Sequence, residues 1–104
     1  MNRYYWSGIS RDERMKAISD IQAIIDKYAT IINFQRFSDI ALGLILELEE
    51  EDLPSLRKEL EHLLLIDETR VEKSGKEINC MIFLNVTFVM GSGNMIIEVP
   101  EIPG

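Results

Sequence analysis

The chain of 104 residues contains only one cysteine, Cys80, and one histidine, His62. A single cysteine excludes a disulfide within the chain, and the two residues together are too few to build a thiolate or imidazole metal cluster in one copy. His62 lies opposite a leucine stripe and Cys80 lies among apolar strand residues, so we interpret His62 as solvent-facing and Cys80 as a buried apolar side chain. Neither residue supports nucleophilic catalysis, and we expect no enzymatic activity and no cofactor.

Long hydrophobic runs and basic residues are also scarce. No apolar run approaches the ~20 residues that a membrane-spanning helix needs, and the N-terminus lacks the apolar segment of a signal peptide. Eleven Lys and Arg stand against eighteen Asp and Glu, which gives a formal charge of −7. This excess of negative charge disfavours a surface that binds a phosphate backbone, so we expect neither nucleic acid nor a membrane as a partner. With a lone free thiol, the composition indicates a cytoplasmic protein.

The strongest local pattern that is present is a strict alternation over residues 40–48. A period of two is typical of a strand with one buried face, so we predict a central strand here. The face to be covered by helices carries Ile40, Leu42, Leu44, Leu46 and Leu48. The opposite face carries Ala41, Gly43, Ile45 and Glu47, which leave room for a close approach.

The N-terminal quarter predicts a strand followed by a helix. Arg3–Trp6 is rich in aromatic strand formers and ends at Ser7-Gly8. Ser10 and Glu13 have the spacing of a capping box, which predicts that a helix starts at this point. The apolar stripe of that helix comprises Met15, Ile18, Ile21, Ile25 and Tyr28.

The remainder predicts a hairpin, a second helix and further strands. Thr30–Phe37 should pair with the central strand through a turn at Ser38-Asp39. Leucines at helical spacing predict a helix from Leu53 to about Leu64. Two C-terminal hairpins are then expected, one joining Thr69–Lys73 to Lys76–Ile78 through Ser74-Gly75, the other joining Ile78–Met90 to Met95–Val99 through Gly91–Asn94.

This order of elements predicts an α+β fold. Its most economical form is a ferredoxin-like β-α-β-β-α-β antiparallel sheet with two helices on one face, extended by a C-terminal β-hairpin. We expect one domain over residues 1–104, with a core at about residues 3–73 and the hairpin extension at about residues 76–99.

Between Arg3 and Lys73 the pattern resembles the ACT domain family. The similarity rests on Ser7-Gly8-Ile9-Ser10-Arg11-Asp12 before the first helix and on Ala29-Thr30-Ile31-Ile32. The resemblance implies a regulatory plait that pairs its sheets into dimers and binds a small ligand, with Gly8, Ser10 and Asp12 as candidate ligand-binding residues. Met15 stands where family members that bind amino acids carry a glycine, so we expect no free amino acid to bind at this turn.

A second candidate surface lies on the helix-free face of the predicted sheet. Met81, Phe83 and Val89 occupy odd positions of the long strand, and Ile45 would share their face. Such an apolar patch is costly in water, so these four residues predict a homodimer interface.

Two further groups have a structural and a functional interpretation. The acidic run from Glu47 to Asp52 could hold a hard cation, but it lacks the spacing of a calcium loop, and we interpret it as a solvated turn. Tyr4, Tyr5 and Trp6 could stack on bases, but we interpret them as core or interface packing.

The sequence therefore favours a non-enzymatic regulatory or interaction module that forms homodimers and has a possible small-molecule effector. The alternatives are a small ferredoxin-like enzyme and an accessory subunit that docks through its C-terminal hairpin.

Overall fold

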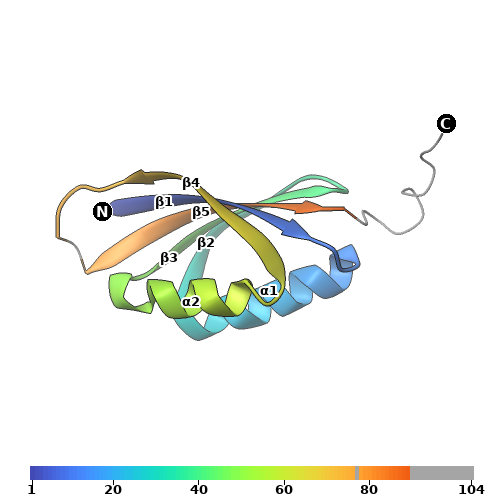
Figure 1. The fold of residues 1–104 in the computed structure, drawn as a ribbon, viewed down its shortest axis with the longest axis horizontal. Coiled ribbons are helices and arrows are strands. Elements are labelled where there is room, and N and C mark those ends of the chain that lie inside the picture. The colour runs from blue at the N-terminus through green and yellow to red at the C-terminus, as the bar shows by residue number, and fades with distance from the viewer. Residues whose placement is uncertain (77, 90–104) are drawn as a thin grey trace.

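A computed structural model describes residues 1–76 and 78–89 of the chain. Figure 1 shows two layers, with five strands in one sheet and both helices against one of its faces. The elements are β1 (Asn2–Ser10), α1 (Arg14–Tyr28), β2 (Ala29–Ser38), β3 (Ala41–Glu49), the 3-10 turn η1 (Glu50–Asp52), α2 (Leu53–Leu60), β4 (Leu64–Glu72) and β5 (Asn79–Phe88). The α+β class and the β-α-β-β-α-β beginning are therefore confirmed, and the fold is loosely ferredoxin-like.

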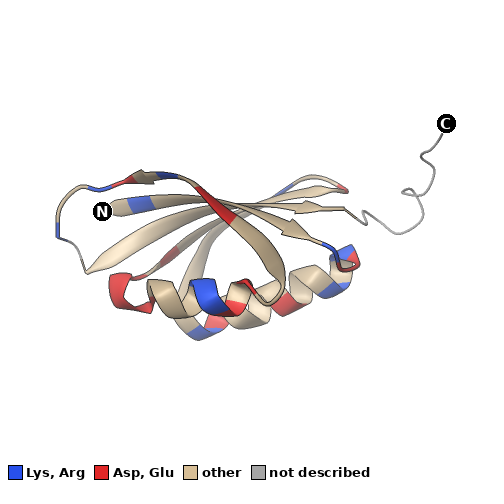
Figure 2. Ribbon diagram, in the orientation of Figure 1, with Lys and Arg blue, Asp and Glu red and all other residues tan. Residues whose placement is uncertain are grey.

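The sheet is mixed, and its strand order is β2-β3-β5-β1-β4. β5 runs parallel to β1 and antiparallel to β3, so the prediction of a wholly antiparallel sheet is wrong. The prediction that the chain after residue 76 extends a finished core is also wrong, because β5 is the central strand. β5 carries no charged residue and is tan along its length in Figure 2, as expected of a strand with neighbours on both sides.

The predicted faces of the two central strands are correct within the strands. β3 buries Leu42, Leu44, Leu46 and Leu48 under the helices, and β5 buries Cys80, Ile82, Leu84, Val86 and Phe88 on the same side. The alternation fails just outside the strands. Ile40 is 43% exposed in the turn before β3 and Ile78 is 78% exposed before β5, so neither belongs to the buried face as predicted. The proposed return strand Met95–Val99 and its turn lie outside the described residues.

β1 is longer than predicted, and this moves the start of α1. Pairing with β5 and β4 keeps the backbone extended as far as Ser10, whose side chain is fully buried. The helix instead begins after Glu13, whose carboxylate accepts from the N–H groups of Met15 and Lys16 at 2.8 and 3.1 Å. The predicted capping box is therefore wrong, and Glu13 alone caps the helix.

α2 is shorter than predicted because its leucine stripe serves two elements. Leu56 and Leu60 enter the core from the helix, whereas Leu64 enters it as the first residue of β4. The prediction of a helix as far as Leu64 is therefore wrong, since heptad-like spacing cannot distinguish a last helical leucine from a first strand leucine.

The predicted tight hairpin at Ser74-Gly75 is wrong as well. β4 and β5 lie on opposite sides of β1, so the connection between them passes the start of β1. The Ser74 N–H donates to Asn2 Oδ1 at 2.8 Å and holds this connection there. Neither helix in residues 1–76 and 78–89 has the length and apolar character needed to cross a membrane.

Candidate functional site

The helix-free face of the sheet is organised in rows that cross the strands. One row comprises Asn33, Ile45, Phe83, Tyr5 and Arg70, one residue from each of β2, β3, β5, β1 and β4. The next row toward the C-terminal end of β5 comprises Gln35, Gly43, Asn85, Ser7 and Asp67. The side chains of one row point away from the helices because paired strand residues share a face.

An aromatic stack forms the centre of this face. The rings of Tyr5 and Phe83 lie 4.8 Å apart with an interplanar angle of 10°. The Arg70 guanidinium lies 5.0 Å from the centre of the Tyr5 ring, and the Tyr5 hydroxyl donates to Glu72 at 3.1 Å. Arg70 also pairs with Glu72. Arg70 and Glu72 of β4 therefore hold the Tyr5 ring of the stack in place, while the Phe83 ring lies beside β3.

A groove of about 260 Å³ opens beside the stack, toward β2. Gly43 forms part of its floor, and Phe37 covers this glycine. A Cβ at Gly43 would lie 2.7 Å from Cε2 of Phe37, so the ring occupies the position where any other residue would have its side chain. The remaining lining comprises Tyr5, Asn33, Gln35, Leu44, Ile45, Phe83 and Asn85.

The structure brings together most of the predicted interface residues. Ile45, Met81 and Phe83 are half-buried on the helix-free face, where Ile45 pairs with Phe83 and Glu47 pairs with Met81. Val89 is 50% exposed just beyond β5, and its N–H donates to the Ser10 carbonyl at 3.1 Å. The groove residues of β2 were missed from the sequence, because only the strand register places them beside Phe83.

The predicted ligand turn before α1 has a different local structure. Gly8 is not in a turn but inside β1, where a Cβ would meet Leu64 Cδ1 at 3.2 Å. The buried Ser10 hydroxyl accepts from the Asp12 N–H at 3.2 Å. The two helix N–H groups that cap onto Glu13 lower the pKa of its carboxyl. A ligand carboxylate would have to displace Glu13 from them, which agrees with our expectation, still untested, that free amino acids do not bind here.

A hydrogen-bonded cluster joins the start of β1 to η1. The Tyr4 hydroxyl donates to the Glu50 carboxylate at 2.8 Å, and the Asn2 side-chain amide donates to the same carboxylate at 2.8 Å. Burial, with the nearby Glu50 carboxylate as a second cause, raises the pKa of Tyr4 to about 12. Burial likewise raises the pKa of Cys80 to about 11. Both groups therefore stay protonated near neutral pH, which suits a hydrogen-bond donor and a core residue rather than a base and a nucleophile.

We expect the burial of Tyr4, together with its contact to Glu50, to make stability fall at high pH. An unfolded tyrosine loses its proton near pH 10, whereas folded Tyr4 keeps it to about pH 12, so the folded chain binds more protons between these values. The stabilisation is complete below pH 10 and is lost as the pH rises toward 12, by about 1–2 kcal/mol after allowing for solvent screening. Urea unfolding at both ends of this range measures it. An equal loss in Tyr4→Phe would show that other groups cause the decline.

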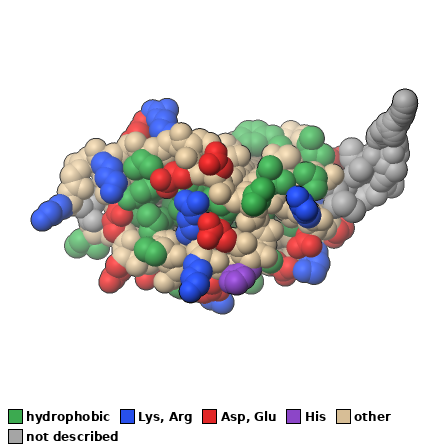
Figure 3. Space-filling model, in the orientation of Figure 1, with side chains coloured by type: hydrophobic (Ala, Val, Ile, Leu, Met, Phe, Trp, Pro, Cys, Tyr) green, Lys and Arg blue, Asp and Glu red, His purple; other side chains and the backbone are tan. Residues whose placement is uncertain are grey.

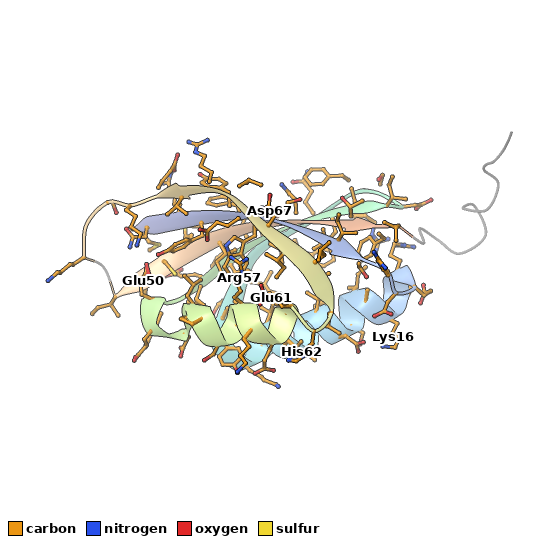
Figure 4. The ribbon with its side chains drawn as sticks, viewed as in Figure 1. Lys16, Glu50, Arg57, Glu61, His62 and Asp67 are labelled. Carbon is orange, nitrogen blue, oxygen red and sulfur yellow. The ribbon has the colours of Figure 1, made fainter. Side chains whose placement is uncertain are left out.

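The other candidates take structural roles. His62 is exposed after α2 and points away from the sheet in Figure 4. Trp6 is buried and donates to Glu68 at 2.9 Å, and Arg57 lies 5.5 Å from the centre of its ring. Figure 3 shows hydrophobic side chains between α2 and β4, and Leu53 and Pro54 line a hollow there together with Trp6 and Arg57. Tyr4 and Trp6 thus enter the core, which confirms packing roles for these two, while Tyr5 lies on the opposite face of the sheet.

The acidic turn does not gather ligands for a cation in the part of the chain that the structure describes. Glu50 is engaged by Asn2 and Tyr4, and no group of three or more His, Cys, Asp or Glu residues is placed to hold a metal ion there.

Comparison of the chain with family models, with curated proteins and with solved structures gives no match.

Proposed function

We propose that the protein is a non-enzymatic, ACT-like assembly module that forms a homodimer through the helix-free face of its sheet. The single observation that supports this most strongly is the aromatic stack of Tyr5 and Phe83, which lies at the centre of the sheet face that neither of the two described helices covers. Two-layer folds normally leave a polar face toward water. Here Ile45 and Met81 adjoin the stack and enlarge the apolar patch.

The size of the face suits a dimer. Five strands spaced ~4.8 Å apart, each about nine residues long at ~3.3 Å per residue, give a face of roughly 700 Å². A standard interface buries about 800 Å² on each partner. A second copy supplies a face of the same size, so a dimer formed through this face would be near the standard size.

The distribution of charge also favours association at the centre. Arg3 and Arg70 lie at the β4 side of the face and both pair with Glu72. β5, which crosses the middle, carries no charge. A second copy that covers the stack can thus leave the other carboxylates of this face, Glu47 on β3 and Asp67 on β4, at the rim of the interface, since burying either without a partner would be strongly unfavourable.

We expect Phe83→Asp to convert the dimer to monomers. A two-fold axis brings the substituted face against itself, so two carboxylates would be desolvated without partners, and the stack with Tyr5 would be lost. Sedimentation equilibrium over a concentration series measures the change, and circular dichroism checks that the variant is folded.

Phe34→Asp is the matched control. Phe34 is also a strand phenylalanine, 39% exposed, but it pairs with Leu44 and therefore lies on the helix side of the sheet. It should leave the dimer intact. A wild type that remains monomeric at high micromolar concentration, or a dimer that persists in Phe83→Asp, would refute the proposed interface.

A further inference from the structure

The groove between β2 and the aromatic stack combines ring faces with primary amides. Asn33, Gln35 and Asn85 contribute the amides. Gln35 and Asn85 both pair with Gly43, from its two sides, so the residue between them has no side chain. Asn33 adjoins them at the next position of β2, opposite Ile45. Three carboxamides thus border one apolar floor.

These amides are free to take up a ligand. Within residues 1–76 and 78–89 none of the three makes a side-chain hydrogen bond to another residue, whereas Asn2 and Asn79 elsewhere in the sheet do. Each carboxamide offers both a donor and an acceptor. The three amides can therefore form hydrogen bonds with the edge of a ligand on which donors and acceptors alternate.

Phe37 provides a platform for a flat ring. It is 60% exposed, and its Cε2 and Cζ atoms lie 2.7 and 3.2 Å from the position that a Cβ of Gly43 would take, with Asn85 Oδ1 at 3.4 Å from the same position. An aromatic ring that is held at one edge and otherwise exposed can stack on a flat ligand. The Phe37 ring can lie here only because residue 43 is a glycine, since a Cβ at Gly43 would displace the ring.

The lining contains no Asp, Glu, Lys, Arg or His. A charged ligand would lose hydration here without gaining a counter-ion, so the chemistry favours a neutral molecule. Aromatic stacking together with Asn and Gln contacts to ring edges is the usual way in which proteins hold an unpaired base.

We propose that this groove binds a neutral, planar heterocycle with amide-type donors and acceptors, namely a free nucleobase or its nucleoside. The ring stacks on Phe37, and its edge is hydrogen-bonded by Asn85 with Gln35 or Asn33. This inference rests on the proposed function, because Ile45 and Phe83 belong both to the groove and to the dimer face. A bound base therefore lies at the edge of the interface.

Calorimetric titration of the full chain with adenine, cytosine, uracil and hypoxanthine tests the site. At least one base should bind with a dissociation constant below about 1 mM, the range accessible to so small a ligand. Phe37→Ala should weaken binding by at least ~5-fold, the lower end of what a stacked aromatic contributes. Phe34→Ala, on the same strand but the other face, should leave it unchanged.

A second pair of variants separates hydrogen bonding from stability and from dimerisation. Asn85→Leu keeps the side-chain size and makes the face more apolar, so the dimer should persist while base binding falls by at least ~10-fold, the loss expected when one bidentate contact is removed. Asn79→Leu, on the same strand outside the groove, should bind as the wild type does.

The two hypotheses fail differently. No heat with any of the four bases at millimolar concentration, or equal binding by wild type and Asn85→Leu, overturns the groove as a base site even when sedimentation shows a dimer. A monomeric wild type that still binds a base through Phe37 and Asn85 supports the groove and overturns the dimer.

Discussion

A chain that ends at Lys73 should not fold, although it contains both helices and four of the five strands. β5 lies between β3 and β1, so its removal leaves both strands without their central partner. It also removes five buried side chains, from Cys80 to Phe88, each at most 2% exposed. At about 1.5–3 kcal/mol for each large apolar side chain, this loss is comparable to the whole stability of a typical small domain, about 5–15 kcal/mol. Circular dichroism and urea titration of the fragment measure the outcome.

A chain that ends at Val89 provides the control for shortening as such. It keeps every element that the structure describes, and we expect it to unfold in one cooperative transition. A cooperative transition in the fragment that ends at Lys73 would mean that the first four strands form their own sheet, as the sequence pattern alone indicated, and that β5 is an addition to it.

The second large effect is expected from Leu46→Ala, which should lower the free energy of unfolding by about 2–5 kcal/mol. Leu46 is fully buried, and its neighbours across the sheet are Ile82 on β5 and Ile31 on β2. Its position between two rigid strands leaves little freedom to close the cavity that the substitution creates. Urea unfolding monitored through the buried Trp6 measures the loss.

Leu65→Ala is the matched control for this substitution. The same atoms are removed from a strand residue that is 69% exposed, so stability should change by no more than about 0.5 kcal/mol. Similar losses in the two variants, or a loss below about 1 kcal/mol for Leu46→Ala, would contradict the assigned faces of β3. Protein concentrations below the association range keep dimerisation out of the comparison.

Local periodicity was enough to predict β3 and β5 and their buried faces, but not their places in the sheet. Leu42 to Leu48 and Cys80 to Phe88 alternate because each strand has one side under the helices, and a period of two needs no knowledge of the neighbours. The place of β5 depends on which edges it pairs with, and that is a property of the whole sheet. Its lack of charge was a visible signal for a central strand that the expected plait did not use.

The ends of the elements were predicted less well because two local signals competed at each. Ser10 and Glu13 fit a capping box, but pairing of Ser10 with Phe88 and Leu64 keeps it in the sheet. In the same way Leu64 continues a helical spacing while pairing with Ser10. Hydrogen bonds to strands distant in sequence decided both cases, and no local pattern contains them.

The candidate site likewise contains residues that local patterns could place and residues that they could not. Ile45, Met81 and Phe83 could be placed on the helix-free face from alternation alone. The amides of Asn33, Gln35 and Asn85 could not be grouped, because an irregularity in β2 between Ile31 and Asn33 shifts its register against β3. A shift of one residue turns the side chains that follow to the other face.

The position of β5 also sets the time at which the chain can fold during synthesis. The parallel pair joins residues 2–10 to residues 80–88, so the first strand made waits for the last strand described. Until β5 has left the ribosome, β1 and β3 have no central neighbour, and their open edges are exposed to other nascent chains. Contacts so distant in sequence slow folding, and at ~5–20 residues per second the delay between β1 and β5 amounts to several seconds. Chaperones that shield unpaired strands should therefore increase the yield of folded protein.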